Sequence, residues 1–187
     1  EDITDVLLTH LHFDHVGGAV NDNNGNLQLA LPNATYWVSA PHWETAIHPN
    51  RREKASFLKE NIMPLLESGQ LKRIEIPAFK SDTSLQEIHF AENISCIVVN
   101  GHTQGMLLPK IQYGKHQIVY MADLLPSVAH LPIPYVMAYD TRPLQTMVEK
   151  KAFLQEAAEK DLVFFFEHDA VNECCSLQLT EKGVRQK

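Results

Sequence analysis

The stretch Thr9-His-Leu-His-Phe-Asp-His-Val-Gly-Gly18 directly follows the apolar run Val6-Leu7-Leu8. Its histidines at i, i+2 and i+5 and its aspartate at i+4 cannot share one face of a regular helix or strand. In a loop that leaves a strand they can turn towards a common point, and imidazole and carboxylate suit zinc, iron or manganese. The stretch therefore predicts a metal site. We expect Val16-Gly17-Gly18 to allow a tight backbone path and then the start of a helix. A histidine-rich surface loop that binds nothing is the alternative.

Composition limits the classes of protein to consider. The chain has 187 residues, of which 44% are apolar and 21% charged, and its net charge is −7. These values predict a single globular domain over residues 1–187 and disfavour nucleic acid or an anionic membrane as a partner. Three cysteines without metal-ligand spacing favour reduced thiols and a cytoplasmic location. The chain opens almost inside a strand, so we expect it to be trimmed at its N-terminus.

Strands and helices alternate along the chain. Ser39 is expected to cap a helix that Pro49 ends, a second helix is expected over 52–67 with a disturbance at Pro64, and residues 21–26 read as a loop. A third helix is expected over 143–160, with Leu144, Met147, Val148, Leu154 and Ala158 on its apolar side. The strands are expected over residues 3–9, 34–38, 71–76, 94–99, 106–111, 117–122, 161–166 and 177–180, with a hairpin turn at 113–115. The class is therefore α/β or α+β.

Three further candidate residues stand at the ends of predicted strands. His102 follows the strand 94–99, Asp123 follows 117–122, and His168 follows 161–166. Taken singly, these residues have ordinary roles, as a turn residue, a helix N-cap and a surface histidine. Strand ends of one sheet cluster in space, so their repeated occurrence predicts a common site.

The ordered set of His10-x-His12-x-Asp14-His15, His102 in a Gly-His-Thr loop, Asp123 and His168 resembles the metallo-β-lactamase superfamily. The resemblance covers almost the whole chain and implies an αβ/βα sandwich that holds two divalent metal ions, zinc before iron or manganese. Only nine residues precede His10, so part of the N-terminal strands of that sandwich is expected to be missing. The implied ligands are His10, His12 and His102 for the first metal, Asp14, His15 and His168 for the second, and Asp123 as a bridge. The other five histidines, His42, His48, His89, His116 and His130, are interpreted as ordinary surface or core residues.

The implied chemistry is hydrolysis by water that both metals activate, with Asp14 guiding the released proton. The expected substrate is a small ester, lactone, thioester or organophosphate. Within the superfamily, true β-lactamases usually lack an aspartate at the bridging position, so Asp123 argues against antibiotic hydrolysis. Asp123 instead resembles the glyoxalase II, lactonase and methyl parathion hydrolase-like branches.

Other features leave alternatives open. Lactonases tend to have a tyrosine three residues after the bridging aspartate, where this chain has Pro126; Tyr135 or Tyr139 is a candidate replacement. The segment 124–139 predicts either a hydrophobic substrate pocket or a loop packed on the sheet. A single-iron enzyme resembling persulfide dioxygenases and a non-catalytic metal-stabilised binding module are the rival functions. The sequence leaves a homodimer open.

Overall fold

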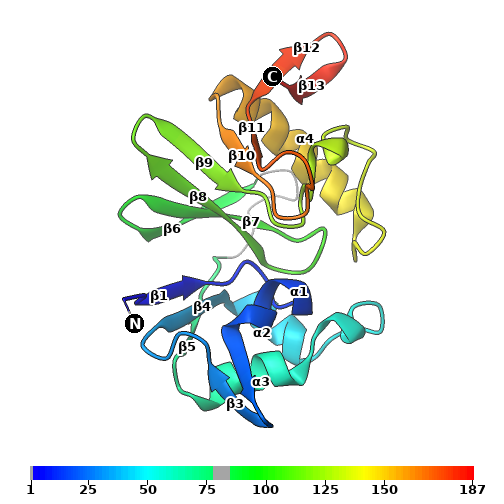
Figure 1. Ribbon diagram of the computed structural model, residues 1–187. Coiled ribbons are helices and arrows are strands. Elements are labelled where there is room, and N and C mark those ends of the chain that lie inside the picture. Colours follow the sequence, from blue (N-terminus) through cyan, green and yellow to red (C-terminus); the bar gives the residue numbers. More distant parts are fainter. Residues whose placement is uncertain (1, 78–84) are drawn as a thin grey trace. The chain divides into compact units, whose positions relative to one another are not determined.

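The computed structural model describes residues 2–77 and 85–187. The chain forms two compact units, Glu1–Pro77 and Ala78–Lys187 (Figure 1). Each unit has its own hydrophobic core. We describe each unit by itself. The expectation of one domain over 1–187 stays a prediction.

The first unit is built on a small parallel sheet. Strand β4 (Thr35–Ser39) lies between β1 (Asp5–Leu7) and β5 (Leu71–Ile74), and both pairings are parallel. The core includes Leu11, Val16, Tyr36, Val38 and Leu65, all fully buried. The remaining elements are α1 (Phe13–Val16), η1 (Gly17–Ala19), the hairpin β2 (Val20–Asn23) and β3 (Asn26–Leu29), α2 (Ala40–Ile47), η2 (Lys54–Ser56) and α3 (Lys59–Glu67).

Several local predictions in this unit are confirmed and two are wrong in part. Ser39 caps α2, because its side-chain oxygen accepts a hydrogen bond from the His42 N–H. The predicted loop 21–26 is instead the tip of a hairpin, with the turn at Asn24 (φ 57°) and Gly25 (φ 86°) and strands on either side. The expected helix over 52–67 begins only at Lys59, and it continues through Pro64 without a break.

The second unit is built on a six-stranded sheet in the order β11-β10-β9-β8-β7-β6. The strands from β6 to β9 pair antiparallel in chain order, and β10 pairs parallel to β9. Helix α4 (Pro143–Glu159) lies between β9 and β10 in the chain and packs on the sheet (Figure 1). Phe153 on this helix stacks on Phe164 of β10 with ring centroids 5.4 Å apart. The remaining bounds are β6 (Gln86–Ala91), β7 (Ile94–Val99), β8 (Met106–Tyr113), β9 (His116–Tyr120), η3 (Val128–His130), β10 (Val163–Phe165), β11 (Cys174–Cys175), β12 (Leu177–Thr180) and β13 (Gly183–Gln186).

The buried face of α4 agrees only in part with the predicted apolar face. Leu154 is buried as predicted, and Met147 and Ala158 are half-buried. Leu144 is 77% exposed and Val148 is 40% exposed, whereas Thr146, Glu149 and Lys150 are buried. Glu149 and Lys150 can be buried because each bonds to backbone groups of a neighbouring segment, and the Thr146 hydroxyl donates to the Arg142 carbonyl at the start of the same helix. The prediction considered hydrophobicity alone, and it was therefore wrong for Leu144 and Val148 in the first half of the helix.

Other parts of the second unit agree with expectation. The predicted hairpin forms between β8 and β9, and Gly114 adopts the left-handed conformation (φ 58°) that the turn requires. Strands β6, β11 and β13, in contrast, were not predicted.

Among the described residues, none of the helices combines the length and the apolar character that crossing a membrane requires.

Candidate functional site

In the first unit, the histidine-rich stretch passes from a loop into a helix. His12 is the N-cap of α1, so Asp14 and His15 lie within this four-residue helix rather than in a loop. The helix thus begins before Val16-Gly17-Gly18, and not after it as predicted. The ring centroids of His10 and His12 are 4.7 Å apart, and those of His10 and His15 are 4.0 Å apart. The structure therefore gathers the three imidazoles, as the sequence predicted.

The side chains of this stretch differ in exposure to solvent. His10 and His12 are buried, whereas the Asp14 side chain is 42% exposed and its carboxylate lies 3.6 Å from Nε2 of His15. The ligand atoms of His10 and His12 lie within 4.8 Å of each other, and so do those of Asp14 and His15. Each pair can therefore contribute two donors to a divalent ion.

Residues outside the motif hold this stretch in place. The backbone N–H of Leu11 donates a 2.8 Å hydrogen bond to Nε2 of His42, which is fully buried on α2. A carboxylate oxygen of the buried Glu53 lies 3.6 Å from Nε2 of His12. His42 was interpreted as an ordinary surface or core residue, and its bond to the motif was not foreseen. No local pattern could reveal it, because the two partners are 31 positions apart.

In the second unit, the three predicted strand-end residues meet around one carboxylate. Oδ2 of Asp123 lies 3.1 Å from Nε2 of His102, and Oδ1 of Asp123 lies 3.4 Å from Nε2 of His168. Strands β7, β9 and β10 run in the same direction within one sheet, so their carboxyl ends share an edge. His102 and Asp123 are buried, and the His168 side chain is 34% exposed. The predicted clustering of these three residues is confirmed.

The backbone immediately before Asp123 is in an uncommon conformation. Ala122 is fully buried and has a φ of 41°, in the left-handed region that residues with a Cβ seldom adopt. Such strain persists only where the surrounding structure enforces it, and it is concentrated at functional sites. Here it turns the chain sharply between the end of β9 and the Asp123 carboxylate.

His102 is held by a second carboxylate that the sequence did not identify. Oδ1 of Asp140, a fully buried residue, lies 3.0 Å from Nδ1 of His102. Burial disfavours the imidazolium, but hydrogen bonds and negative charge from Asp123 and Asp140 outweigh it and raise the pKa of His102 to about 9. A carboxylate on Nδ1 leaves Nε2 as the nitrogen that faces the site. Asp140 lies in an irregular segment without periodicity, so no sequence signal marked it.

The loop that carries His102 is fixed to helix α4. The N–H groups of Asn100 and Gly101 donate to the two carboxylate oxygens of Glu149, at 2.7 and 3.1 Å. A Cβ on Gly101 would lie 2.3–2.6 Å from atoms of Thr146, so only glycine fits here. Burial raises the pKa of Glu149, although the two N–H donors favour its ionised form.

The segment 124–139 is packed against the core of the second unit, and its role as a substrate pocket stays a prediction. Leu124, Leu125 and Leu131 are buried in the core of the second unit, as expected of a loop packed on the sheet. The side chains of Tyr135 and Tyr139 are 61% and 74% exposed. The part of either tyrosine in catalysis stays a prediction.

Comparisons with known proteins give the family. The model described as the metallo-beta-lactamase superfamily matches residues 1–168. A comparison with curated protein sequences found no match. A probable metal-dependent hydrolase from Staphylococcus aureus is 28% identical, with a TM-score of 0.80 over 94% of this chain and 58% of that one.

Two lactone-cleaving enzymes are similar in structure at lower identity. AidC, a dizinc quorum-quenching lactonase, is 21% identical, with a TM-score of 0.76 over 100% of this chain and 64% of that one. An N-acyl homoserine lactone hydrolase with product bound at its catalytic metal centre is 22% identical, with a TM-score of 0.65 over 90% of this chain and 57% of that one. This chain thus spans less than two thirds of the length of these structures. The chain belongs to the metallo-β-lactamase superfamily and has its fold of mixed α/β content.

Proposed function

We propose that the chain is a metal-dependent hydrolase that cleaves a small ester, lactone, thioester or organophosphate. The observation that carries this proposal is the orientation of Asp123, whose two oxygens face two different imidazoles, His102 and His168. A buried carboxylate with one oxygen directed to each side is suited to joining two cations. The chemistry of the donors, imidazole and carboxylate alone, fits zinc and also admits iron or manganese.

Under this proposal seven residues are the ligands of the two ions. His10, His12 and His102 would hold the first ion, and Asp14, His15 and His168 the second, with Asp123 shared. When bound, the ions supply the positive charge that lowers the pKa of water and polarises the group under attack. The dizinc lactonase AidC, which has a similar fold, supports two zinc ions as the first choice.

The protein's own residues orient the donors and handle the proton. Asp140 holds Nδ1 of His102, and Glu149 fixes the backbone beneath it. Asp14 is suited to carry the proton released as the bond breaks, because its carboxylate is partly exposed and can reach solvent. Hydrolysis requires no side-chain nucleophile in this scheme.

The partner in this proposal is a small molecule rather than nucleic acid, because the net charge of −7 opposes a phosphate backbone. The similarity to lactone-cleaving enzymes supports an ester or lactone as the first substrate to test. The free thiols of the three cysteines favour a reducing compartment, and we therefore propose the cytoplasm. Oxidation at a single iron is the second candidate, and its signature is oxygen consumption.

The test compares two single variants for metal content and turnover. Asp123→Ala should reduce occupancy of both ions, because this carboxylate is proposed to touch both. His116→Ala should keep its metal, because His116 is an exposed residue at the start of β9. Mass spectrometry measures bound zinc, iron and manganese. Hydrolysis is assayed with ester, lactone, thioester and phosphotriester substrates, and an oxygen electrode records oxygen consumption in the same reactions.

Each result distinguishes the candidates. Two zinc ions and hydrolysis without oxygen uptake support the proposal. One iron with oxygen uptake supports the oxidoreductase, and bound metal without any turnover supports a binding module. Full occupancy of both metal sites and unchanged turnover in Asp123→Ala would refute the bridging role of Asp123.

A further inference from the structure

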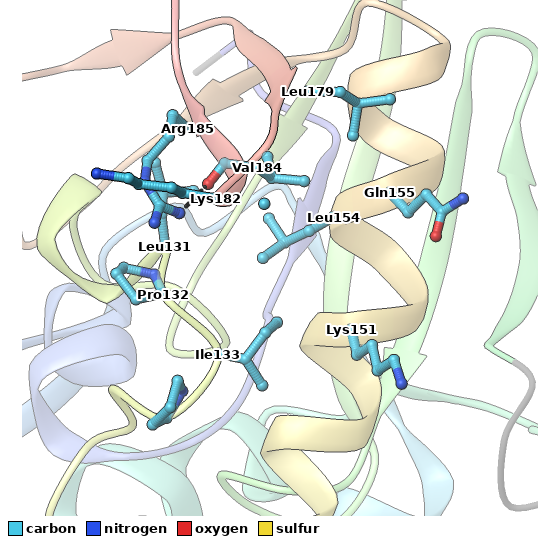
Figure 2. Close-up of a pocket in the computed structure, with 12 residues that line it drawn as sticks. Leu131, Pro132, Ile133, Lys151, Leu154, Gln155, Leu179, Lys182, Val184 and Arg185 are labelled. Carbon is cyan, nitrogen blue, oxygen red and sulfur yellow. Dashed lines mark hydrogen bonds between the residues drawn. The ribbon is translucent and has the colours of Figure 1, made fainter.

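The second unit contains a pocket that includes none of the candidate metal ligands. Its volume is about 410 Å³, within the range of roughly 300–1,000 Å³ that is typical of small-molecule sites. Helix α4 forms one wall, residues 131–134 form another, and the β12–β13 hairpin forms the third (Figure 2).

The interior of this pocket is apolar. Leu131 and Leu154 are almost fully buried and form its base, with Ile133 and Val184 half-buried beside them. Leu179 is 55% exposed on the hairpin side, so a large apolar side chain faces solvent at the rim. In Figure 2, Leu131, Ile133, Leu154 and Val184 converge from the three walls. A hydrocarbon chain would cover this surface and remove it from water.

The charges at the pocket are all positive. Lys151, Lys182 and Arg185 line it, and no carboxylate is among the described residues that do so. This is unusual for a chain with a net charge of −7. Lys182 and Arg185 lie together above Leu131 and Pro132 (Figure 2), and neither forms an ion pair with any carboxylate in the described parts of the chain.

We propose that this pocket binds a small amphiphilic anion, namely a medium-chain carboxylate. Its hydrocarbon chain occupies the apolar base, and its carboxylate accepts hydrogen bonds from Lys182 and Arg185. Arginine and lysine next to an apolar surface provide the charge complement that such a molecule requires. The site is distinct from the proposed metal centre, and its occupation requires no metal.

The experiment is calorimetric titration of the full chain with octanoate. We expect saturable binding at one site per chain, with much weaker binding of butyrate, whose chain is too short to cover the base. Octyltrimethylammonium has the same chain but a cationic head group, and we expect no binding. Equal binding of octanoate and octyltrimethylammonium would overturn the proposal, because it would show that charge plays no part.

Variants assign the binding to this pocket. Lys182→Glu combined with Arg185→Glu should weaken octanoate binding by at least about tenfold, as expected for the loss of charge-assisted contacts. Lys115→Glu is the matched control, since Lys115 and Lys182 are each the second residue of a two-residue hairpin turn and each is exposed. Thermal unfolding of these variants shows whether the fold is kept. Octanoate affinity that is unchanged by the double substitution would refute the site.

Two further measurements decide where octanoate binds and whether a second copy of the chain covers this surface. Octanoate binding that survives in Asp123→Ala supports the pocket, and binding that is lost there would assign the ligand to the metal centre. A dimer that forms without octanoate and is broken by the charge reversal would assign this surface to a second copy of the chain, and would overturn the proposal.

Discussion

Replacing Gly101 by alanine tests how the loop that carries His102 is held. The new Cβ would lie 2.5 Å from the backbone nitrogen of Thr146 and 2.6 Å from its Cα, whereas ordinary contacts begin at 3.4 Å. The loop and the start of α4 must therefore separate by about 0.9 Å. The same movement stretches the hydrogen bonds from Asn100 and Gly101 to Glu149.

The size of the effect follows from this geometry. Overpacking that forces backbone shifts costs about 1–3 kcal/mol. In a protein of this length, 1 kcal/mol corresponds to roughly 2–4 °C in Tm. We therefore expect Gly101→Ala to lower Tm by about 2–12 °C. Bound metal should fall with it, because the displaced loop carries a proposed ligand.

Thermal unfolding followed by circular dichroism measures this effect, with Gly18→Ala as the control. A Cβ on Gly18 meets nothing within 4 Å, and Gly18 is exposed. Combining Gly101→Ala with Thr146→Ala should not restore stability, because the clash with backbone atoms of residue 146 remains. If Gly101→Ala unfolded at the same temperature as Gly18→Ala, the close packing of this loop on α4 would be disproved.

Three further predictions concern buried polar groups and thiols. Asp140→Asn should weaken zinc binding by about 10–100-fold in a chelator competition assay while the fold is kept, because the charge that orients His102 is lost; unchanged affinity would deny Asp140 this role. Burial lowers the pKa of Lys150 to about 8, so the folded state releases a proton that the unfolded state keeps up to about pH 10.5. The contribution of Lys150 to stability should therefore rise with pH between about 8 and 10.5, and denaturation of Lys150→Met should lack this rise. A thiol reagent at pH 8 should modify the exposed Cys174 quickly and the buried Cys96 and Cys175 only after unfolding. Burial raises the pKa of Cys175 to about 11 and that of Cys96 to about 12. Rapid reaction of all three thiols would contradict the burial.

Much of the second unit follows from local sequence patterns. The continuous apolar run 94–99 predicts a buried strand, and the Gly114 turn predicts the hairpin that follows. Because these strands run to a common edge, the residues after them could be expected to meet, and His102, Asp123 and His168 do so.

The features that were missed depend on contacts between distant residues. Asp140 and His42 each contact a motif residue more than 30 positions away, and periodicity carries no information about such pairs. The buried face of α4 was predicted from hydrophobicity, but Glu149 and Lys150 are buried because they bond to backbone groups of other segments.

The polar inner side of α4 has a consequence for divergence among relatives. The residues that fix the neighbouring loops occupy one turn, from Thr146 to Lys150, while Leu144 and Val148 face solvent. Exchanging the outward residues would lower sequence identity and leave the position of the imidazole unchanged. Overall sequence identity along this helix is therefore a poor guide to whether two family members share the same site geometry. The residues of this single turn, from Thr146 to Lys150, are a better guide.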